Sequence, residues 1–316
     1  MDWLERMNGA LKYIEDNLTD EIYFDKVARI ACCSTYHFQR MFSFITGIPL
    51  SEYIRRRRLT LAAFELQSSD IRIIELAGKY GYDSPNSFTR AFEKLHGITP
   101  TSARNAGVHL KAFPRISFHI TIKGDMEMDY RIEQRPAFSV FGKAAIVDIT
   151  DDECYKQIPE FWLKSIHDGT MECILKIASG GDKATVKGDI YGSDRMLLNA
   201  VMYEHNSDTG TFRYMVCQNI PQSGVPDEFE ILQVPSMTWA IFPTERHPVE
   251  QTTEKIQSIW KRIYSEWFPT SSYVHVDDAP DCEMYYHAEN GLFIAEAWIP
   301  VKKILINDQK AKINLY

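Results

Sequence analysis

The sequence predicts a multidomain chain, with an all-α N-terminal domain followed by an α+β domain built on an antiparallel sheet. The length of 316 residues suggests about two domains at the usual ~150 residues each. Residues that start and end helices occur in two similar copies in the first third of the chain, whereas β-rich runs and two helical stretches make up the rest. We expect the first domain at 1–107, a linker with a leading strand at 108–124, the second domain at 125–306 and a tail at 307–316.

Composition narrows the class of protein. The chain is 45% hydrophobic and 25% charged, which is ordinary for a globular protein and argues against a disordered or fibrous one. It has no apolar run long enough to cross a bilayer, and its N-terminus lacks the apolar core of a signal peptide. Its six cysteines are scattered without a C-x-x-C pair, so we expect no disulfide framework and no zinc site. These features predict a cytoplasmic protein without membrane contact.

Charge is divided unevenly along the chain. The net charge is −8 in total, but residues 1–126 carry +3 and residues 127–316 carry −11. An acidic second half should repel polyanions and suits a cationic ligand. The first half has only a mild positive excess, so any binding of a polyanion there must depend on a few well-placed basic residues.

The N-terminal domain contains an internal repeat at an offset of fifty residues. The matched positions share a serine, two phenylalanines, an arginine and a glycine followed by isoleucine: Ser34/Ser84, Phe38/Phe88, Phe42/Phe92, Arg40/Arg90, Gly47/Gly97 and Ile48/Ile98. In each copy a short helix is followed by a turn, and the serine is placed to cap the next helix. The phenylalanines give that second helix an apolar face, and the glycine is placed to end it. The pattern predicts two helix-turn-helix units, although one such helical pair is also common in helical bundles.

The polar face of each second helix carries the candidate DNA-reading residues. They are Tyr36, His37, Gln39 and Arg40 in the first copy, and Asn86, Ser87, Thr89 and Arg90 in the second. Arginine matches the paired acceptors of guanine, and asparagine or glutamine suits adenine, so such helices can read base edges in a major groove. Arg40 and Arg90 are the strongest candidates, with other basic residues contacting phosphates.

A helical stretch, LSEYIRRRRLTLAAFELQSS, lies between the two copies and predicts a rigid strut that sets their spacing. Recognition helices on one side of a duplex should lie roughly 34 Å apart, which is one helical turn. The four consecutive arginines, Arg55 to Arg58, wind around this helix and cannot all face phosphates. We expect at least one of them to pair with an acid or to snorkel.

Residues from about 6 to 105 resemble the AraC/XylS-type DNA-binding domain, through the stretches HFQRMFSFITGIPLSEYIRRRRLTLA and IIELAGKYGYDSPNSFTRAFEKLHGITP. The resemblance implies a transcription regulator that binds double-stranded promoter DNA sequence-specifically. An activator of this kind would also have RNA polymerase as a partner. One position departs from the family pattern, because Ala103 stands where an aromatic usually precedes the arginine, here Arg104. We expect this departure to affect helix packing more than base reading.

The C-terminal half contains eight β-rich runs: ISFHITI, MDYRIEQ, AFSVFGKAAIV, GDIYG, TFRYMVC, EFEILQV, SMTWAIFP and LFIAEAWIP. Two helical stretches intervene, DECYKQIPEFWLKSI and PVEQTTEKIQSIWKRIYSEWF. Strands followed by a helix, twice over, predict an α+β domain with an antiparallel sheet.

Glu296 is the candidate ligand-binding acid of this half. Strand alternation in GLFIAEAWIP places Glu296 and Trp298 on one face, and both faces are otherwise apolar. A buried carboxylate is costly unless something pairs with it. Glu296 is therefore either a structural acid, paired with an arginine or with backbone N–H groups, or a pocket acid for a cationic effector, with Trp298 adding a cation–π contact. Trp239, Tyr203 and Tyr285 are candidates to complete the wall of such a pocket.

Residues from about 125 to 305 resemble the GyrI-like effector-binding domain of multidrug-sensing regulators, through GDIYG, RYMVC, ILQVPSMTWAIFP, DCEMYYH and IAEAWIP. The resemblance implies two β-α-β-β modules around a central cleft for amphipathic or cationic compounds. It also implies that the glutamate of the terminal E-x-W-x-P segment, here Glu296, faces that cleft. The stretch DGTMECILKIASGGDKATVKG matches less well, which leaves the ligand open.

Motifs for other chemistry are missing from the sequence. It contains no G-x-x-x-x-G-K-[ST], G-x-G-x-x-G, G-x-S-x-G or H-E-x-x-H, and its nine histidines are dispersed. We therefore predict a one-component transcription regulator that binds promoter DNA and a small-molecule effector, with no cofactor, no metal and no catalytic residue. The alternatives are a protein that only sequesters a small molecule, and a hydrolase with Glu296 as general acid or base.

Overall fold

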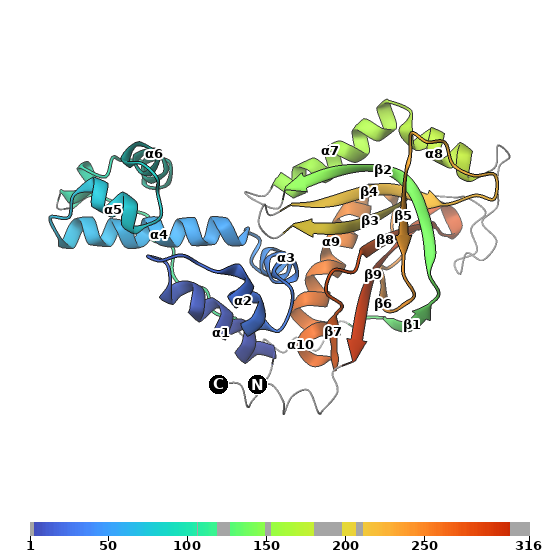
Figure 1. The fold of residues 1–316 in the computed structure, drawn as a ribbon, viewed down its shortest axis with the longest axis horizontal. Helices are drawn as coiled ribbons and strands as arrows, with labels where there is room; N and C mark the ends of the chain where they lie inside the picture. The colour runs from blue at the N-terminus through green and yellow to red at the C-terminus, as the bar shows by residue number, and fades with distance from the viewer. Residues whose placement is uncertain are drawn as a thin grey trace. The chain divides into compact units, whose positions relative to one another are not determined.

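The computed structural model divides the chain into two compact units, Met1–Thr121 and Ile122–Tyr316 (Figure 1). The residues it describes are 3–105, 107–118, 127–148, 153–179, 198–206 and 211–303. Among them, no helix is both long enough and apolar enough to span a membrane.

The first unit is helical throughout its regular parts. Its helices, in chain order, are α1 (Trp3–Asp16), α2 (Phe24–Ala31), α3 (Thr35–Thr46), α4 (Leu50–Ser68), α5 (Ile73–Lys79), α6 (Pro85–His96) and the short 3-10 turn η1 (Ser102–Arg104). The pairs α2–α3 and α5–α6 are the two predicted helix-turn-helix units, and α4 is the predicted strut between them (Figure 1). This confirms the all-α, doubled architecture of the N-terminal domain.

Each recognition helix is anchored by its phenylalanines. Phe38 and Phe42 of α3 are fully buried, as are Phe88 and Phe92 of α6. The α6 pair belongs to a cluster that also contains Leu59 and other apolar residues of the strut. Because these side chains lock one face of each helix to its unit, the polar face is held in a fixed direction.

The second unit is an α+β domain, as predicted. Its strands are β1 (Arg131–Arg135), β2 (Phe138–Asp148), β3 (Asn199–Asn206), β4 (Thr211–Asn219), β5 (Glu230–Val234), β6 (Met237–Pro243), β7 (Tyr273–His275), β8 (Asp281–His287) and β9 (Phe293–Lys303). Its helices are α7 (Glu153–His167), α8 (Thr170–Ala178), α9 (Thr252–Arg262), the π-helical turn η4 (Ile263–Trp267) and α10 (Phe268–Thr270), with 3-10 turns η3 (Val249–Gln251) and η5 (Glu289–Gly291).

The described strands form an antiparallel sheet in the order β1-β6-β9-β8-β3-β4-β2-β5, with β7 paired to β9. Two β-α-β-β modules account for its centre, β2-α7/α8-β3-β4 and β6-α9-β8-β9, and they meet where β3 pairs with β8. Each module also receives an edge strand from outside itself, since β1 pairs with β6 and β5 pairs with β2. The two modules implied by the sequence resemblance are therefore present.

The pairing register of β8 and β9 assigns the two buried glutamates to opposite faces of the sheet. Glu283 lies opposite Ala297, and Met284 lies opposite Glu296. Since directly paired residues share a face and neighbours along a strand alternate, Glu283 and Glu296 point in opposite directions. We call the face that bears Glu283 the helical face, because α7 and α9 bond to it, and the face that bears Glu296 the opposite face.

The sheet curls around its opposite face. Phe138 of β2 and Trp239 of β6 have four strands between them, which would separate them by about 24 Å in a flat sheet at about 4.8 Å per strand. Their ring centroids are only 6.4 Å apart. Gly142 permits the close approach of β2 to β4, because a Cβ atom there would lie 2.0 Å from the carbonyl oxygen of Val216.

Several predicted elements differ from those observed. Of the predicted leading strand ISFHITI, residues 116–118 are irregular and the rest lie outside the described residues, as does GDIYG. The predicted long helix of PVEQTTEKIQSIWKRIYSEWF ends its regular part at Arg262 and continues as the π turn and α10. Strands β3, β7 and β8 and helix α8 were not predicted, because their short or acid-containing sequences lack a clean alternation or helical stripe.

Candidate nucleic-acid interface and effector site

The two recognition helices begin and end as the repeat predicts. The Ser34 hydroxyl accepts a hydrogen bond from the His37 backbone N–H at 3.2 Å, and the Ser84 hydroxyl accepts one from the Ser87 N–H at 3.2 Å. Both helices stop at a glycine in the left-handed region, with φ of 74° after α3 and 79° after α6. Pro85 occupies the first turn of α6, where its missing N–H has no consequence.

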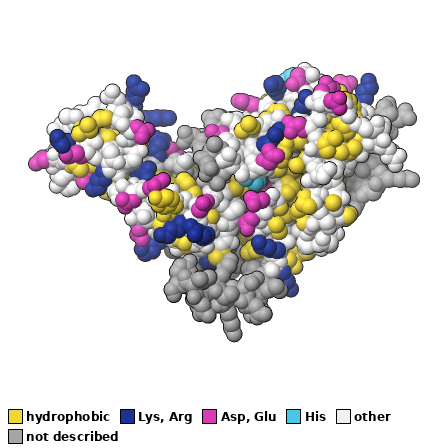
Figure 2. Space-filling view, in the orientation of Figure 1, with side chains coloured by type: hydrophobic (Ala, Val, Ile, Leu, Met, Phe, Trp, Pro, Cys, Tyr) yellow, Lys and Arg dark blue, Asp and Glu magenta, His cyan; other side chains and the backbone are white. Residues whose placement is uncertain are grey.

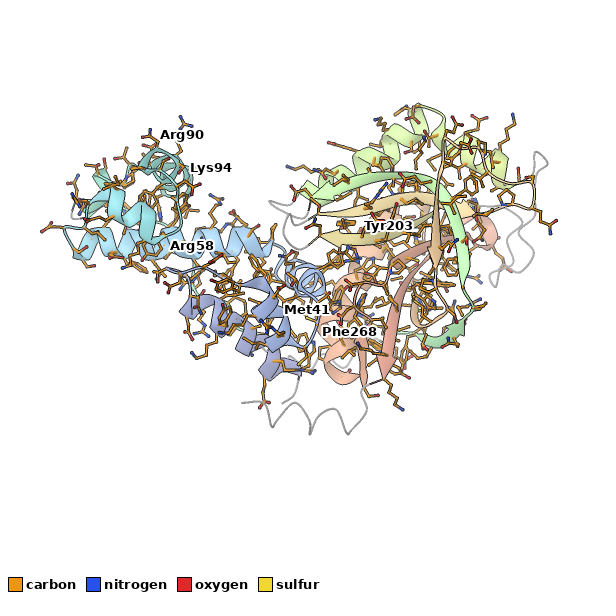
Figure 3. All side chains as sticks on the ribbon, in the orientation of Figure 1. Met41, Arg58, Arg90, Lys94, Tyr203 and Phe268 are labelled. Carbon is orange, nitrogen blue, oxygen red and sulfur yellow. The ribbon has the colours of Figure 1, made fainter. Side chains whose placement is uncertain are left out.

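The second recognition helix, α6, presents its predicted readers to solvent. Asn86, Ser87 and Arg90 are exposed and Thr89 is half-buried. Lys94, one turn after Arg90, is exposed on the same side, and both side chains point away from the body of the unit (Figure 3). Figure 2 shows Lys and Arg side chains projecting from the edge of the unit where α6 lies. Sequence reasoning missed Lys94, although its spacing of four from Arg90 on the polar face was a usable signal.

The hydroxyl of Ser87 is occupied within the cap of α6. It donates to the Ser84 carbonyl oxygen at 2.8 Å, and the Ser84 hydroxyl donates to it at 3.1 Å. Among the exposed α6 side chains, Asn86 and Arg90 are therefore better placed than Ser87 to bond to bases.

The first recognition helix, α3, holds its arginine differently. Tyr36, His37 and Arg40 are buried, with Arg40 only 6% exposed, and Gln39 is half-buried. The Arg40 guanidinium donates to the Tyr36 hydroxyl at 3.1 Å and lies 5.8 Å from the Tyr36 ring and 5.4 Å from the Phe44 ring. Two aromatics of its own helix, one turn before and one turn after, thus orient Arg40.

The arginine run of the strut serves the fold. Arg55 and Arg56 both pair with the buried Glu52, and Arg58 donates to the Leu18 carbonyl oxygen at 2.9 Å. The remaining member, Arg57, pairs with an acid of α1. This confirms that at least one arginine of the run pairs with an acid, and every member has a hydrogen-bond or ion-pair partner.

Glu296 is neutralised on the opposite face of the sheet. Its side chain is 0% exposed, and Arg131 donates to both carboxylate oxygens, at 2.5 and 3.1 Å. The indole N–H of Trp298 adds a third hydrogen bond at 2.8 Å. Of the two roles considered from the sequence, the structure shows the acid paired with an arginine.

The other candidates on this face gather into one cluster. Trp239, Trp298 and Tyr203 pack together with apolar residues of the curled sheet. The Trp239 and Trp298 rings meet edge to face at 5.8 Å, and the Arg135 guanidinium lies 5.1 Å from the Trp298 ring. The sequence thus identified residues that are close in space, but the acid on this face, Glu296, is already paired with Arg131 of β1.

The remaining candidate, Tyr285, lies on the helical face beside a different acid. The Tyr285 hydroxyl donates to the Glu283 carboxylate at 2.8 Å. Two further donors complete the set, the Trp260 indole N–H at 2.8 Å and the Tyr214 hydroxyl at 3.3 Å. The Tyr214 hydroxyl in turn accepts from the indole N–H of Trp162 on α7 at 2.8 Å. We call Glu283 with these four aromatics the Glu283 cluster.

The Glu283 cluster holds a negative charge without a cation. Glu283 is 9% exposed, and no Lys, Arg or His forms an ion pair with it among the described residues. Burial, followed by the charge of Glu283, raises the pKa of Tyr214 and Tyr285 well above the ordinary value, so both hydroxyls remain donors. Neutral donors satisfy the carboxylate oxygens but leave the charge uncompensated, which favours a cation nearby.

Aromatic rings surround this acid, and two of them are partly exposed. Trp162 and Tyr285 meet edge to face at 5.8 Å, and both are only half-buried, whereas Tyr214 and Trp260 are fully buried beneath. Such rings attract a positive charge through their faces. The segment DCEMYYH contributes to the family resemblance, but the sequence does not single out Glu283, because only the β8–β9 register shows which face it occupies.

The described residues offer no group of three or more His, Cys, Asp or Glu side chains arranged to hold a metal ion. Cys217 and Cys282 are buried, and burial raises the pKa of both thiols, so neither favours the thiolate form. Within the described residues, the candidate binding surfaces are the recognition helices and the Glu283 cluster.

Two family models match the chain. A GyrI-like small molecule binding domain matches residues 128–302, and a helix-turn-helix domain matches residues 27–106. Among curated relatives, the HTH-type transcriptional activator AarP of Providencia stuartii is 44% identical over 98 residues, which are 31% of this chain and 73% of AarP. The multiple antibiotic resistance protein MarA of Escherichia coli strain K12 is 37% identical over 98 residues, 31% of this chain and 77% of MarA.

Solved structures resemble each half separately. A bacterial transcription regulation protein from Staphylococcus aureus MU50 covers 56% of this chain and 99% of its own, at 17% identity and a TM-score of 0.40. The AraC-type DNA-binding domain of a regulator from Chromobacterium violaceum covers 31% of this chain and 88% of its own, at 24% identity and a TM-score of 0.30.

Proposed function

This chain belongs to the AraC-type transcription regulators that carry a GyrI-like small molecule binding domain, and from that premise we propose a specific mode of action. A cationic aromatic effector binds at the Glu283 cluster and changes the affinity of α3 and α6 for a promoter. The observation that carries the proposal is a buried carboxylate held by three aromatic donors, with no ion-pair partner among the described side chains.

The DNA-binding half of the proposal rests on the doubled recognition helices. We assign base reading to Asn86 and Arg90 on α6, with Ser87 and Thr89 as flanking contacts. On α3 we assign it to the half-buried Gln39 and to Arg40, with Tyr36 and His37 as flanking contacts, and the buried Arg40, Tyr36 and His37 side chains must turn outward to reach the bases. Lys94 would contact a phosphate, because a lysine one turn along the exposed face lies at the edge of a groove-inserted helix. A promoter-binding regulator acts where the DNA is, so we propose the cytoplasm as its compartment.

Selection from random duplexes tests this half. Arg90→Ala should relax specificity at one or two base pairs, costing about 1–3 kcal/mol there. Lys94→Ala is the matched control from the same helix face. It should weaken binding to all sequences alike and reduce the slope of log affinity against log salt concentration by about one. If the selection returned no enriched sequence for the wild-type chain, the assignment of sequence-specific binding would be refuted.

The effector half rests on the contrast between the two buried acids. Glu296 already has the Arg131 guanidinium, whereas the Glu283 carboxylate accepts only from neutral groups among the described residues. A positive charge placed beside Glu283 gains an ion pair in a low-dielectric site and contact with the faces of Trp162 and Tyr285. A neutral ligand of the same shape would gain only the apolar contact.

Calorimetric titration distinguishes these two acids. Glu283→Gln preserves the shape of the side chain and should weaken binding of tetraphenylphosphonium about thirtyfold or more. It should leave the weaker binding of neutral triphenylphosphine oxide nearly unchanged. Glu296→Gln is the matched control and should leave the cation affinity within a factor of about three, provided the variant stays folded. The opposite pattern would assign the effector to the Glu296 face.

Coupling between effector binding and DNA binding distinguishes a regulator from the two alternatives, a sequestering protein and a hydrolase. A regulator requires that the effector change DNA affinity, and by linkage that DNA change effector affinity by the same factor. A protein that binds the cation without this coupling would be a sequestering protein. Turnover of a bound ester, lost in Glu283→Gln, would favour a hydrolase. If the chain is an activator, as the name of AarP states for that protein, RNA polymerase is its further partner.

A further inference from the structure

The segment that follows the second helix-turn-helix unit returns across the DNA-binding unit. Residues 108–118 form no helix or strand, yet they are hydrogen-bonded to the first unit at several points. We call this segment the strap. From the sequence it was expected to be part of a linker, and a linker need not bond to the domain it leaves.

The middle of the strap is bound by the strut helix α4. The Phe113 backbone N–H donates to the Thr60 hydroxyl at 3.1 Å, and the Phe113 carbonyl oxygen accepts from Arg57 at 2.6 Å. The Arg56 guanidinium lies 5.1 Å from the Phe113 ring. The Thr60 hydroxyl donates to the Arg56 carbonyl oxygen at 2.8 Å, so it is held in the orientation that accepts from the strap.

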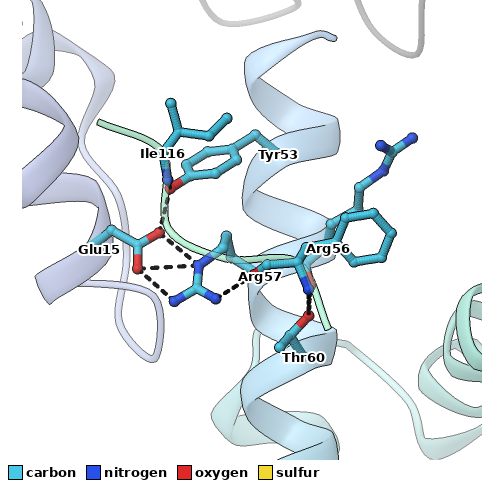
Figure 4. A network of polar contacts seen from close by, with 7 residues as sticks. Glu15, Tyr53, Arg56, Arg57, Thr60 and Ile116 are labelled. Atoms are coloured by element: carbon cyan, nitrogen blue, oxygen red, sulfur yellow. Dashed lines mark hydrogen bonds and ion pairs between the residues drawn. The ribbon is translucent and has the colours of Figure 1, made fainter. Parts of the chain in front are cut away.

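A polar network joins the strap to the strut and to α1 (Figure 4). The Tyr53 hydroxyl accepts from the Ile116 N–H at 3.1 Å and donates to Glu15 at 2.6 Å. Arg57 donates to the same Glu15 carboxylate, at 2.8 Å from its Nη2. Burial opposes the charge of Glu15, but the bonds from Arg57 and Tyr53 outweigh it and hold the pKa of the carboxyl below its ordinary value.

The end of the strap is bound at α1 and α3. The Asn8 side-chain amide donates to the Phe118 carbonyl oxygen at 2.9 Å and accepts from the Phe118 N–H at 2.9 Å. The Phe118 ring is 6% exposed and lies 6.3 Å from Phe42, which anchors recognition helix α3. The Asn8 side-chain amide thus bonds to both the N–H and the carbonyl oxygen of Phe118, as a neighbouring β-strand would.

The strap also contacts the core of the second helix-turn-helix unit. Leu110 and Phe113 pack against the cluster that contains Phe88 and Phe92, the two anchors of α6. One continuous segment of eleven residues, 108–118, therefore packs against the core that holds α6, against the Phe42 ring of α3 and against the strut between them.

We propose that the strap sets the relative position of the two recognition helices, and that effector binding acts on DNA affinity by loosening or tightening it. The proposal rests on the proposed function, since it explains how a signal from the effector unit reaches both helices. The strap is the part of the first unit that leads along the chain into the effector unit. Because its bonds lie away from the base-reading faces, it acts as a positioning element.

The test uses the full chain and duplexes whose half-site spacing is lengthened by one or two base pairs. Thr60→Val removes one hydrogen bond to the strap and Asn8→Ala removes two, and neither changes a recognition helix. The wild-type chain should discriminate strongly against the altered spacing. In the double variant, the ratio of the affinities for the normal and the lengthened spacing should fall by about threefold to tenfold. The base preferences within each half-site should stay unchanged. Thr101→Val and Asn105→Ala are matched controls at exposed positions and should behave as wild type.

Hydrogen exchange gives a second readout that does not need DNA. The amides of Phe113, Ile116 and Phe118 should exchange slowly in the full chain, and faster or slower when tetraphenylphosphonium is bound. Unchanged spacing discrimination in a folded double variant, or strap amides that exchange at the rate of free chain, would overturn this proposal alone. A wild-type chain without any spacing preference would overturn both this proposal and the two-helix recognition on which it rests.

Discussion

Replacing Arg131 with methionine should destabilise the second unit by about 3 kcal/mol, because it leaves the buried Glu296 carboxylate without its cation. Breaking a buried pair by removing one partner costs about 3–5 kcal/mol. Glu296 is 0% exposed, but the Arg131 side chain is 28% exposed, so water can reach the vacated position and the lower end applies. The Trp298 indole N–H still bonds to Glu296 and prevents a larger loss.

A double variant isolates the pair from its surroundings. Arg131→Met combined with Glu296→Met replaces both charges with apolar side chains of similar volume, which should restore stability to within about 1 kcal/mol of the wild type. Urea unfolding followed by tryptophan fluorescence measures both, with the slope of the transition as the check that the same unit unfolds. A cost below about 0.5 kcal/mol for Arg131→Met, or a double variant weaker than the single, would refute the structural role given to Glu296.

Three further predictions concern the framework of the two units. Ser84→Ala removes the cap of α6 and should cost about 1 kcal/mol in the urea unfolding of the first unit, with a matching loss of DNA affinity only if α6 frays. Gly142→Ala should cost about 3 kcal/mol or more and lower expression, because its Cβ would meet the Val216 carbonyl oxygen at 2.0 Å; a neutral effect would contradict the close approach of β2 to β4. Burial lowers the pKa of His96 below 6.5, so as the pH falls the unfolded chain takes up the proton before the folded chain does. The free energy of unfolding should therefore decrease as the pH falls below about 6.5. His96→Gln should flatten this dependence, measured as denaturation midpoints between about pH 7.5 and 5.5.

The sequence predicted the N-terminal unit well because its rules are local. A serine cap, two phenylalanines one turn apart and a closing glycine lie within fourteen residues of each other, and their repetition at a fixed offset adds independent support. The burial of Arg40 and the contacts of its guanidinium with the Tyr36 and Phe44 rings were not predictable, because the repeat places Arg40 on the polar face of its helix.

The α+β fold class of the effector unit was predictable from the sequence, but the position of Glu283 at its candidate site was not. Alternation showed that Glu296 is buried, yet its partner Arg131 lies 165 positions away and no local pattern connects the two. The same limit prevented identification of Glu283 from the sequence, since its face follows from pairing with Ala297 and two of its three donors come from other elements, β4 and α9. Trp239, Trp298 and Tyr203 were correctly grouped in space, whereas Tyr285 belongs with Glu283 on the other side of the sheet.

The most direct test of the account is the affinity of the full chain for its selected promoter duplex, titrated with tetraphenylphosphonium. The wild-type affinity should change by about fivefold or more as the cation saturates, in either direction, because coupling of this kind is typically 1–3 kcal/mol. Glu283→Gln should bind the duplex as the wild type does without the cation and should no longer respond to it. A Glu283→Gln chain that responds fully, or a wild-type chain that binds the cation with no change in DNA affinity, would contradict the account.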